Sequence, residues 1–455
     1  MKKGWEDVDE KTLQELKSEL EQSAVDQPTA AMDPDQVRAM LQLTAKGTVK
    51  QCISNATLVL ENDPKLQSLI RLNEFTEKLE ISEKAFWQRD GAAITDTDLA
   101  YIRQYLEDTY GITSEKNLDA ALRIAANQNR YHPVQDYLNS LQWDGQPRIR
   151  NLLHHFLGAD TSDLTFLITK VFLIGAILRV FRKGCKFEYM LCLVGDQGIG
   201  KSSFFRLLAV RDEWFTDDLK KLDDENVYRK LQGHWIIEMG EMIATANAKS
   251  VEEIKSFLSR MSDVYKVPYE RYPKDRLRQC VFGGTTNMER FLPLDRSGNR
   301  RFLPIMTSER DMEVHILDDE KASRAYIDQV WAEAMVLFRN HDYSMVFPKE
   351  MADAMQARLQ EFMPEDTKVG MIQAYLDQSC DRYVCTRLLY ENALHHEGHE
   401  PQIWELREIS DIMNQSIHGW RKVKQHRYET YGRQNSWEKD DSFRQLDDGE
   451  MTPFS

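Results

Sequence analysis

Glycines, a lysine and two serines lie close together in the middle of the chain, at a spacing that suits phosphate chemistry. Residues 195–203 read Gly-Asp-Gln-Gly-Ile-Gly-Lys-Ser-Ser, which matches G-x-x-x-x-G-K-[ST]. Because glycine has no Cβ atom, it allows backbone conformations that turn successive N–H groups toward one point. In such a loop the lysine reaches the β- and γ-phosphates of a nucleotide, and the first serine hydroxyl can bind Mg²⁺. The sequence therefore predicts a nucleotide site made of Gly195, Asp196, Gln197, Gly198, Ile199, Gly200, Lys201, Ser202 and Ser203.

The elements around this loop must place it at the edge of a sheet. An apolar run over residues 189–194 enters the loop, and Phe204, Leu207 and Leu208 follow it at helical spacing. A strand, a glycine turn and a helix in this order form the P-loop unit of an α/β fold, in which the helix N-terminus adds partial positive charge beside the phosphates. The alternative is a glycine-rich connection in an ordinary α/β domain. The complete motif and its context favour phosphate binding.

A second apolar run, further along the chain, ends in a carboxylate. Residues 235–237 are apolar and precede Glu238, and Glu241 lies in the turn that follows. Doubly wound sheets bind ligands at the carboxyl ends of their strands, so a glutamate there lies beside the phosphates. Such a carboxylate can hold a metal-bound water or orient the attacking one. We expect Ser202 and Glu238 to bind Mg²⁺, with Glu241 as a second catalytic candidate; the alternative is an ordinary strand that ends in glutamate.

Two later segments offer further polar groups for phosphoryl transfer. The strand-like run 279–286 ends at Asn287, whose amide suits a γ-phosphate or the attacking water. Arg300 and Arg301 lie between a turn and a short apolar run. Arginine stabilises the spread negative charge of phosphoryl transfer, often from a neighbouring subunit. Either arginine is a candidate for this role, and either could instead be a structural ion-pair partner.

A basic segment that contains several tyrosines follows Glu238. Between Lys255 and Arg278 basic side chains outnumber acidic ones, and Tyr265, Tyr269 and Tyr272 are interleaved with them. Basic side chains neutralise phosphates and aromatic rings stack on bases, so this composition is typical of contact with nucleic acid. The candidate contacts are Lys266, Arg271, Lys274, Arg276 and Arg278. The alternative is a solvated hairpin.

The tail of the chain carries another basic cluster. A predicted helix at 406–414 is followed by residues 418–427, which read His-Gly-Trp-Arg-Lys-Val-Lys-Gln-His-Arg. A helix, a turn and a basic helix are consistent with a small winged-helix module that binds DNA. Arg421, Lys422 and Lys424 would then face phosphates. A plain helical cap with a charged face is the alternative.

Composition limits the classes of protein that remain. A formal net charge of −15 over 455 residues argues against a protein that coats nucleic acid with its whole surface, but permits a basic channel. Six cysteines without a C-x-x-C pair indicate no disulfide framework and fit a reducing cytosol. The longest apolar run, 164–180, contains Lys170, so we expect a buried helix and no membrane association.

We expect three parts in the chain. Residues 1–130 form a helical N-terminal region, and residues 131–345 form a P-loop ATPase domain of the α/β class. Residues 365–455 form a small C-terminal domain with winged-helix character, and Pro364 marks the boundary before it.

Taken in order, these elements resemble the virulence-associated E family, which comprises P-loop ATPases of phages and mobile genetic islands related to superfamily-three helicases and AAA+ proteins. The stretches that carry the resemblance are residues 132–145, 184–187, 195–203, 235–241, 254–259, 284–287 and 295–302. The resemblance implies a Walker A role for Lys201 and Ser202, a Walker B role for Glu238 and a sensor 1 role for Asn287. It also implies a trans-acting arginine at position 300 or 301, and a pore-facing loop in the basic segment after residue 255.

The same resemblance implies a function. We expect a Mg²⁺-dependent ATPase that forms a homo-oligomeric ring, with a hexamer expected, and moves on DNA as a helicase or translocase. It would act in replication of a phage or mobile element in the cytoplasm of a bacterial host, with other replication proteins as partners. Two alternatives stay open: an ATP-dependent loader or assembly switch without unwinding activity, and an origin-binding initiator whose tail domain contacts DNA.

Overall fold

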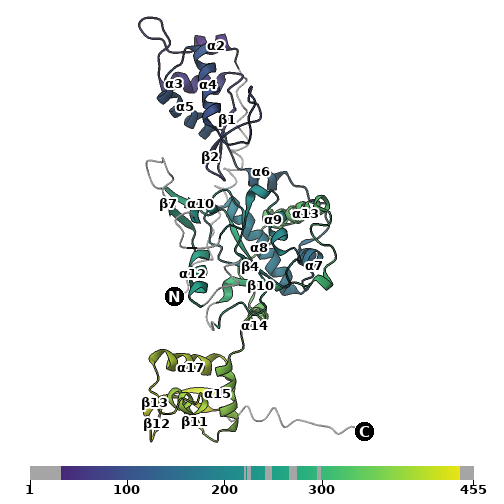
Figure 1. Ribbon diagram of the computed structural model, residues 1–455, viewed down its shortest axis with the longest axis vertical. Coiled ribbons are helices and arrows are strands. Elements are labelled where there is room, and N and C mark those ends of the chain that lie inside the picture. The colour runs from purple at the N-terminus through teal and green to yellow at the C-terminus, as the bar shows by residue number, and fades with distance from the viewer. Residues whose placement is uncertain are drawn as a thin grey trace. The chain divides into compact units, whose positions relative to one another are not determined.

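The structure is a computed structural model that describes residues 32–219, 222, 227–240, 248–265, 274–294 and 299–440 (Figure 1). The chain divides into two compact units, Met1–Ser140 and Leu141–Ser455. The first unit has its own apolar core, to which side chains between Val37 and Ala126 contribute. The second unit contains the parallel sheet that carries the predicted site residues.

The first unit combines helices with a small sheet. Its elements are α2 (Pro34–Ala39), α3 (Ile53–Asn62), β1 (Ile70–Asn73), β2 (Lys78–Ile81), α4 (Asp96–Tyr110), α5 (Glu115–Gln128), β3 (Arg130–Tyr131) and α6 (Pro133–Ser140). β1 pairs antiparallel with β2 and parallel with β3. We expect a helical region here, and the small sheet is a correction. Its strands have two to four residues, which is too short to display a two-residue hydrophobic period.

The first unit extends to residue 140, past the predicted limit at residue 130. Tyr131 of β3 lies opposite Asn73 of β1 in the sheet. The ring of His132 is 5.5 Å from that of Phe75, and His132 is buried. These contacts attach the start of α6 to the first unit and give His132 a packing role.

A parallel five-stranded sheet forms the centre of the second unit. Its strands are β4 (Met190–Val194), β5 (Phe215–Thr216), β6 (Ile236–Glu238), β9 (Val281–Thr286) and β10 (Phe302–Met306). Their order is β10–β4–β9–β6–β5, and all neighbouring strands are parallel. Every residue of β4 is buried, as expected for a parallel strand with both faces covered. The predicted mixed α/β class with a parallel sheet is therefore confirmed.

Helices and short elements surround this sheet (Figure 1). They are η1 (Ile149–Asn151), α7 (Leu152–Leu157), α8 (Asp163–Phe181), α9 (Lys201–Leu208), η2 (Asp212–Trp214), α10 (Val227–Leu231), α12 (Ala248–Leu258), β7 (Ser262–Tyr265), β8 (Lys274–Leu277), η3 (Asn299–Arg301), η4 (Glu309–Asp311), α13 (Glu320–Arg339), η5 (Lys349–Met351) and α14 (Ala352–Glu361). β4 and α9 confirm the predicted strand and helix on either side of the glycine loop, which we define as residues 195–200.

The longest apolar run forms α8, a helix in the core of this unit. Among the described residues, α8 is long and apolar enough to cross a membrane, but 78% of that window is buried inside the protein. The indole of Trp235 donates a hydrogen bond of 3.0 Å to the carbonyl of Ala176 in α8. A Cβ atom on Gly175 would lie 2.2 Å from the ring of Phe187, so the helix packs closely on its neighbours. The predicted buried helix is confirmed.

Packing around the sheet continues beyond residue 345, where the sequence analysis ends the central domain. The backbone N–H of Leu292 donates to the carbonyl of Phe362 at 3.0 Å. The rings of Phe362 and Phe291 are 6.0 Å apart, and Phe362 is buried. Because α14 leads into these contacts, it belongs with the parallel sheet.

The end of the described chain has a core of its own. Its elements are α15 (Thr367–Gln378), β11 (Tyr383–Cys385), α16 (Thr386–Leu388), the π-helix η6 (Leu389–Ala393), α17 (Ile403–Gln415), β12 (Trp420–Tyr428) and β13 (Gly432–Lys439). The strands form an antiparallel sheet in the order β11–β13–β12.

The basic segment predicted as a helix at 418–427 is the strand β12 instead. Its partly buried residues Trp420, Val423 and His426 are three positions apart, which resembles a helical period. The register shifts between Val423 and His426, and this irregularity breaks the two-residue alternation of an ordinary strand. The prediction of a helix was wrong because a bulged strand imitates helical spacing over a few residues.

Candidate functional site

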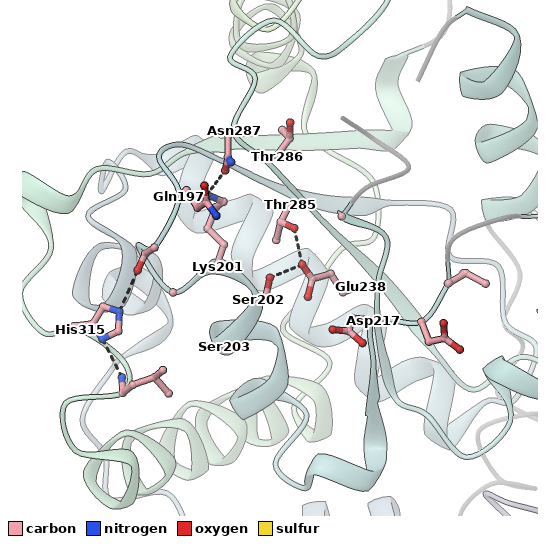
Figure 2. Close-up of a pocket in the computed structure, with 16 residues that line it drawn as sticks. Gln197, Lys201, Ser202, Ser203, Asp217, Glu238, Thr285, Thr286, Asn287 and His315 are labelled. Carbon is pink, nitrogen blue, oxygen red and sulfur yellow. Dashed lines mark hydrogen bonds between the residues drawn. The ribbon is translucent and has the colours of Figure 1, made fainter. Parts of the chain in front are cut away.

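A cavity of about 810 Å³ lies where β4, β6 and β9 end at their carboxyl side (Figure 2). Its lining residues are Gln197, Gly198, Gly200, Lys201, Ser202, Ser203, Asp217, Asp218, Leu219, Glu238, Gly240, Thr285, Thr286, Asn287, His315 and Leu317. Parallel strands place their carboxyl ends at one edge, so the topology brings residues distant in sequence into this pocket.

The glycine loop takes its shape from positions that only glycine fills without strain. Gly198 and Gly200 have φ angles of 95° and 93°, in the left-handed region. A Cβ atom on Gly195 would lie 2.3 Å from the hydroxyl of Thr307, so this position is closed to larger residues. α9 begins at Lys201, immediately after the loop, and its first backbone N–H groups lack partners within the helix.

The ammonium of Lys201 lies inside the loop and is held by oxygen atoms. Its Nζ donates to the carbonyls of Gly195 and Asp196 at 2.7 Å and 2.6 Å, and to Oδ1 of Asn287 at 3.0 Å. Lys201 is 7% exposed. Burial lowers the pKa of its ammonium, while the charges of Asp196 and Glu238 oppose that shift. The predicted lysine and asparagine therefore meet in one place.

Glu238 ends β6 and faces the start of α9. Its Oε1 accepts hydrogen bonds from the hydroxyls of Ser202, at 2.7 Å, and Thr285. The structure is thus consistent with the predicted association of Ser202 with Glu238. Glu241, the second candidate, lies outside the described residues.

The second oxygen of Glu238 is buried, and it has no hydrogen-bond partner among the described residues. Burial raises the pKa of Glu238, and the nearby charge of Asp217 raises it further, against the two hydroxyl hydrogen bonds. A buried hydrogen-bond acceptor without a partner costs free energy. A hydrogen-bond donor or a cation that contacts this oxygen would therefore be bound favourably. Hydroxyl and carboxylate oxygens are typical ligands of a hard divalent cation.

β9 explains how two distant motifs are connected. It lies between β4 and β6 in the sheet, so its end reaches both the glycine loop and Glu238. Asn287 contacts Lys201 on one side, and Thr285 contacts Glu238 on the other. Thr285 is not among the site residues predicted from the sequence. Its position two residues before Asn287 at the end of a strand was the available signal.

The pocket also contains residues that the sequence analysis misses. Asp217 and Asp218, which belong to none of the predicted site motifs, line the pocket directly after β5. β5 has two residues, too few to be recognised as a strand, so the carboxylates after it gave no signal. His315 and Leu317 lie in a connecting segment that matches no sequence motif, so the sequence did not indicate that they line the pocket.

Arg300 and Arg301 differ in their surroundings. Nε of Arg301 lies 3.1 Å from Oε2 of Glu188, and Arg300 lies 3.7 Å from Oε1 of the same carboxylate. The side chain of Arg300 is 73% exposed, whereas that of Arg301 is 22% exposed. Neither is among the described residues that line the pocket of its own chain. Arg301 fits the structural ion-pair alternative, and Arg300 points to solvent.

Two arginines of the basic hairpin formed by β7 and β8 are buried, which differs from the predicted nucleic-acid contacts. Arg278, predicted to contact nucleic acid, is buried, and its guanidinium makes a two-pronged ion pair with Asp263 at 2.7 Å and 3.0 Å. It also lies over the ring of Phe257 at 4.2 Å. Arg276 is buried as well, and burial lowers its pKa. The ion pair of Arg278 therefore links the two ends of the hairpin, and neither arginine side chain is exposed at the surface of the structure.

The remaining predicted contacts are distributed over two regions. Lys266 and Arg271 lie outside the described residues, and Lys274 begins β8. In the C-terminal part, Arg421, Lys422 and Lys424 are exposed on β12. Arg421 pairs with Glu438 of β13 at 3.0 Å.

Fold and site together define a parallel α/β domain whose strand ends carry a glycine loop, a buried lysine and a buried carboxylate. Residues 138–364 match the family model of the virulence-associated protein E-like domain. The chain belongs to this family, and the resemblance found in the sequence is confirmed.

The chain is also similar to solved structures. Two apo A-form structures of the C-terminal region of NrS-1 are similar to it. One is 14% identical and covers 82% of this chain and 96% of its own, with a TM-score of 0.43. The other is 12% identical and covers 81% of this chain and 96% of its own, with a TM-score of 0.46. None of the curated proteins matches the chain.

Proposed function

We propose that this protein is a Mg²⁺-dependent ATPase with a P-loop core, and that its pocket binds the triphosphate of ATP. The observation that carries the proposal is the meeting of Ser202 and Glu238 through a 2.7 Å hydrogen bond, beside the Lys201–Asn287 contact. A lysine, a hydroxyl and a carboxylate at the end of a glycine loop are the groups that phosphoryl transfer requires.

Each pocket residue has a role in this proposal. The loop N–H groups and Lys201 bind the phosphates, which would replace the carbonyl oxygens that Lys201 contacts now. Ser202 and the free oxygen of Glu238 hold the metal ion, which supplies positive charge for the transferred phosphate. Asn287 orients the attacking water, and Glu238 or Glu241 accepts its proton.

The proposed enzyme works as a homo-oligomeric ring, most simply a hexamer. Arg300 is exposed and outside its own pocket, which suits an arginine that completes the site of the next subunit. Arg301 is less exposed and makes the shorter ion pair with Glu188 of its own chain. We assign the trans-acting role to Arg300.

The ring is proposed to act on DNA as a helicase or translocase in replication of a phage or mobile element, in the cytoplasm of a bacterial host. Membership of the virulence-associated E family supports this part of the proposal. Lys266, Arg271 and Lys274 remain the proposed contacts near the pore, and other replication proteins the proposed partners. The proposal involves no membrane association.

One observation favours a second function, that of an origin-binding initiator. Burial of Arg276 and Arg278 removes two of five predicted contacts from the central hairpin. Residues 420–439 carry six basic and two acidic side chains in a chain of net charge −15. Over residues 367–439, the helix α15, the strand β11, the adjoining segments α16 and η6, the helix α17 and the hairpin of β12 and β13 follow the element order of a winged-helix module. In this second function, the C-terminal domain binds DNA and brings the ATPase domain to it.

Hydrolysis by the purified full chain tests the proposal. Lys201→Ala is expected to lower the rate of ATP hydrolysis about a hundredfold or more. Lys321→Ala is the matched control, because Lys321 is exposed on α13, outside the pocket-lining set. Equal activity of the two variants would contradict the ATPase proposal. DNA-stimulated turnover without strand separation would favour the initiator or the assembly switch over the helicase.

A further inference from the structure

His315 and Leu317 line the pocket from residues 313–318, a segment between η4 and α13. The Cγ2 atom of Ile316 and the Nε2 atom of His315 would lie 3.1 Å and 3.3 Å from a Cβ atom placed on Gly200. Nε2 of His315 is also 3.4 Å from the carbonyl of Gly198. This segment therefore touches the glycine loop at two of its glycines.

Several hydrogen bonds fix the segment in this position. The backbone N–H groups of Glu313 and Val314 both donate to the carbonyl of His155, at 3.2 Å and 3.1 Å. The imidazole of His155 lies 2.5 Å from the Glu313 carboxylate. At the other end, the hydroxyl of Ser323 donates to the carbonyl of Ile316 at 2.9 Å. A rigid segment can contribute to a binding site without a large ordering cost.

Two side chains of this segment reach the pocket. His315 lies with one ring nitrogen 3.4 Å from Gly198 O and the other 3.3 Å from the N–H of Leu317. Because both ring nitrogens face backbone groups, the contact that His315 can make with a ligand in the pocket is through the aromatic ring itself. Leu317 lines the pocket and is 44% exposed. An exposed leucine in the lining of the pocket is suited to an apolar or aromatic ligand group.

The direction of a bound nucleotide follows from the proposed function, on which this inference rests. Figure 2 shows Glu238 and His315 on opposite sides of Lys201. If the terminal phosphates and the metal lie at Ser202 and Glu238, the phosphate chain passes Lys201 and the sugar and base lie toward His315. We infer that His315 and Leu317 form the nucleobase subsite.

This subsite holds the base by stacking and apolar contact. Aromatic faces and aliphatic side chains contact any base, since every base has a flat apolar face. A site that holds the base by stacking and apolar contact discriminates only modestly between different bases. A site that forms hydrogen bonds with the edge of one base rejects the other bases strongly. The expected preference between ATP and GTP is therefore within about tenfold.

The test compares ligands with and without a base on the full chain. Isothermal titration calorimetry with Mg²⁺ measures the affinity for ADP and for inorganic pyrophosphate. Leu317→Ala is expected to weaken ADP binding about tenfold and to leave pyrophosphate binding unchanged. Leu317→Met should restore ADP affinity, and Leu43→Ala, at an exposed leucine in the first unit, is the control.

Each outcome separates the two proposals. Unchanged ADP affinity in Leu317→Ala, or an equal loss for ADP and pyrophosphate, would overturn the base subsite and leave the ATPase proposal in place. A preference for ATP over GTP of more than a hundredfold in the unmodified protein would also overturn it. Failure of the unmodified protein to bind either ligand would remove the proposed function, and the subsite with it.

Discussion

The hydroxyl of Ser202 donates a hydrogen bond of 2.7 Å to the carboxylate of Glu238, a residue 36 positions further along the chain. This contact joins the start of α9 to the end of β6, and it leaves the second carboxylate oxygen buried and free of partners among the described residues. Two motifs that are separate in sequence thus form one oxygen-rich corner. The proposed chemistry depends on this corner.

Glu238→Gln tests the role of the carboxylate. The amide oxygen can still accept from Ser202, but the amide can neither take a proton from water nor offer a second oxygen to the metal ion. We therefore expect turnover to fall about 10²–10⁴-fold, while nucleotide binding without Mg²⁺ persists. Single-turnover hydrolysis and ADP titration measure the two effects separately. Glu253→Gln, at an exposed position on α12, is the control. Turnover within twofold of the unmodified protein would exclude Glu238 from the chemistry.

The pH dependence of hydrolysis follows from the pKa shifts in the pocket. Burial raises the pKa of Glu238 above its usual 4.5 and lowers that of Lys201 below its usual 10.5. The active form needs Glu238 ionised, which is fulfilled above its raised pKa, and Lys201 protonated, which is fulfilled below its lowered pKa. A plot of kcat/KM against pH should therefore be bell-shaped. The bell should be narrower than one set by the usual pKa values of glutamate and lysine. A profile flat from pH 5 to pH 10 would contradict these assignments.

Arg278→Ala should act on stability and not specifically on nucleic-acid binding. It leaves Asp263 buried without its two-pronged partner, which costs about 3–5 kcal/mol of unfolding free energy. Chemical denaturation measures the loss. The double variant Arg278→Met with Asp263→Leu should recover much of it, because no unpaired charge remains. A fully stable Arg278→Ala protein with weakened DNA binding would restore the original interpretation of this residue.

Arg300 can be tested by mixing subunits. Arg300→Ala and Lys201→Ala proteins should each be inactive as ATPases when alone. A mixed ring places an intact Lys201 pocket beside an intact Arg300 in roughly a quarter of its interfaces, if subunits mix at random around a head-to-tail ring. Steady-state hydrolysis of the mixture should recover to that level. No recovery after verified subunit exchange would place Arg300 outside the neighbouring site. Arg301→Ala should instead lower the unfolding temperature, because it removes an ion pair with Glu188.

The sequence predicts the glycine loop and its flanking elements because their signals are local. A motif within nine residues and an apolar run on one side suffice to define β4, the loop and α9. Glu238 and Asn287 could be expected at the same edge since parallel strands align their carboxyl ends.

Other features could not be predicted because they depend on pairing between distant segments. Arg278 follows β8 and forms a buried ion pair with Asp263 on β7, and composition does not reveal that these two strands pair. Asp217 enters the pocket only because a two-residue strand pairs with β6. The bulge in β12 produced a helical spacing in a strand.

Nucleotide binding by the pocket is the central claim, and equilibrium titration measures it most directly. We predict that Mg²⁺ and a non-hydrolysable ATP analogue bind the unmodified full chain with one nucleotide per subunit. Lys201→Ala should weaken this binding at least about tenfold, because the ammonium is lost from the phosphate position, whereas Lys321→Ala should bind as tightly as the unmodified chain. Equal affinity of the Lys201→Ala and unmodified proteins for the analogue would contradict the account.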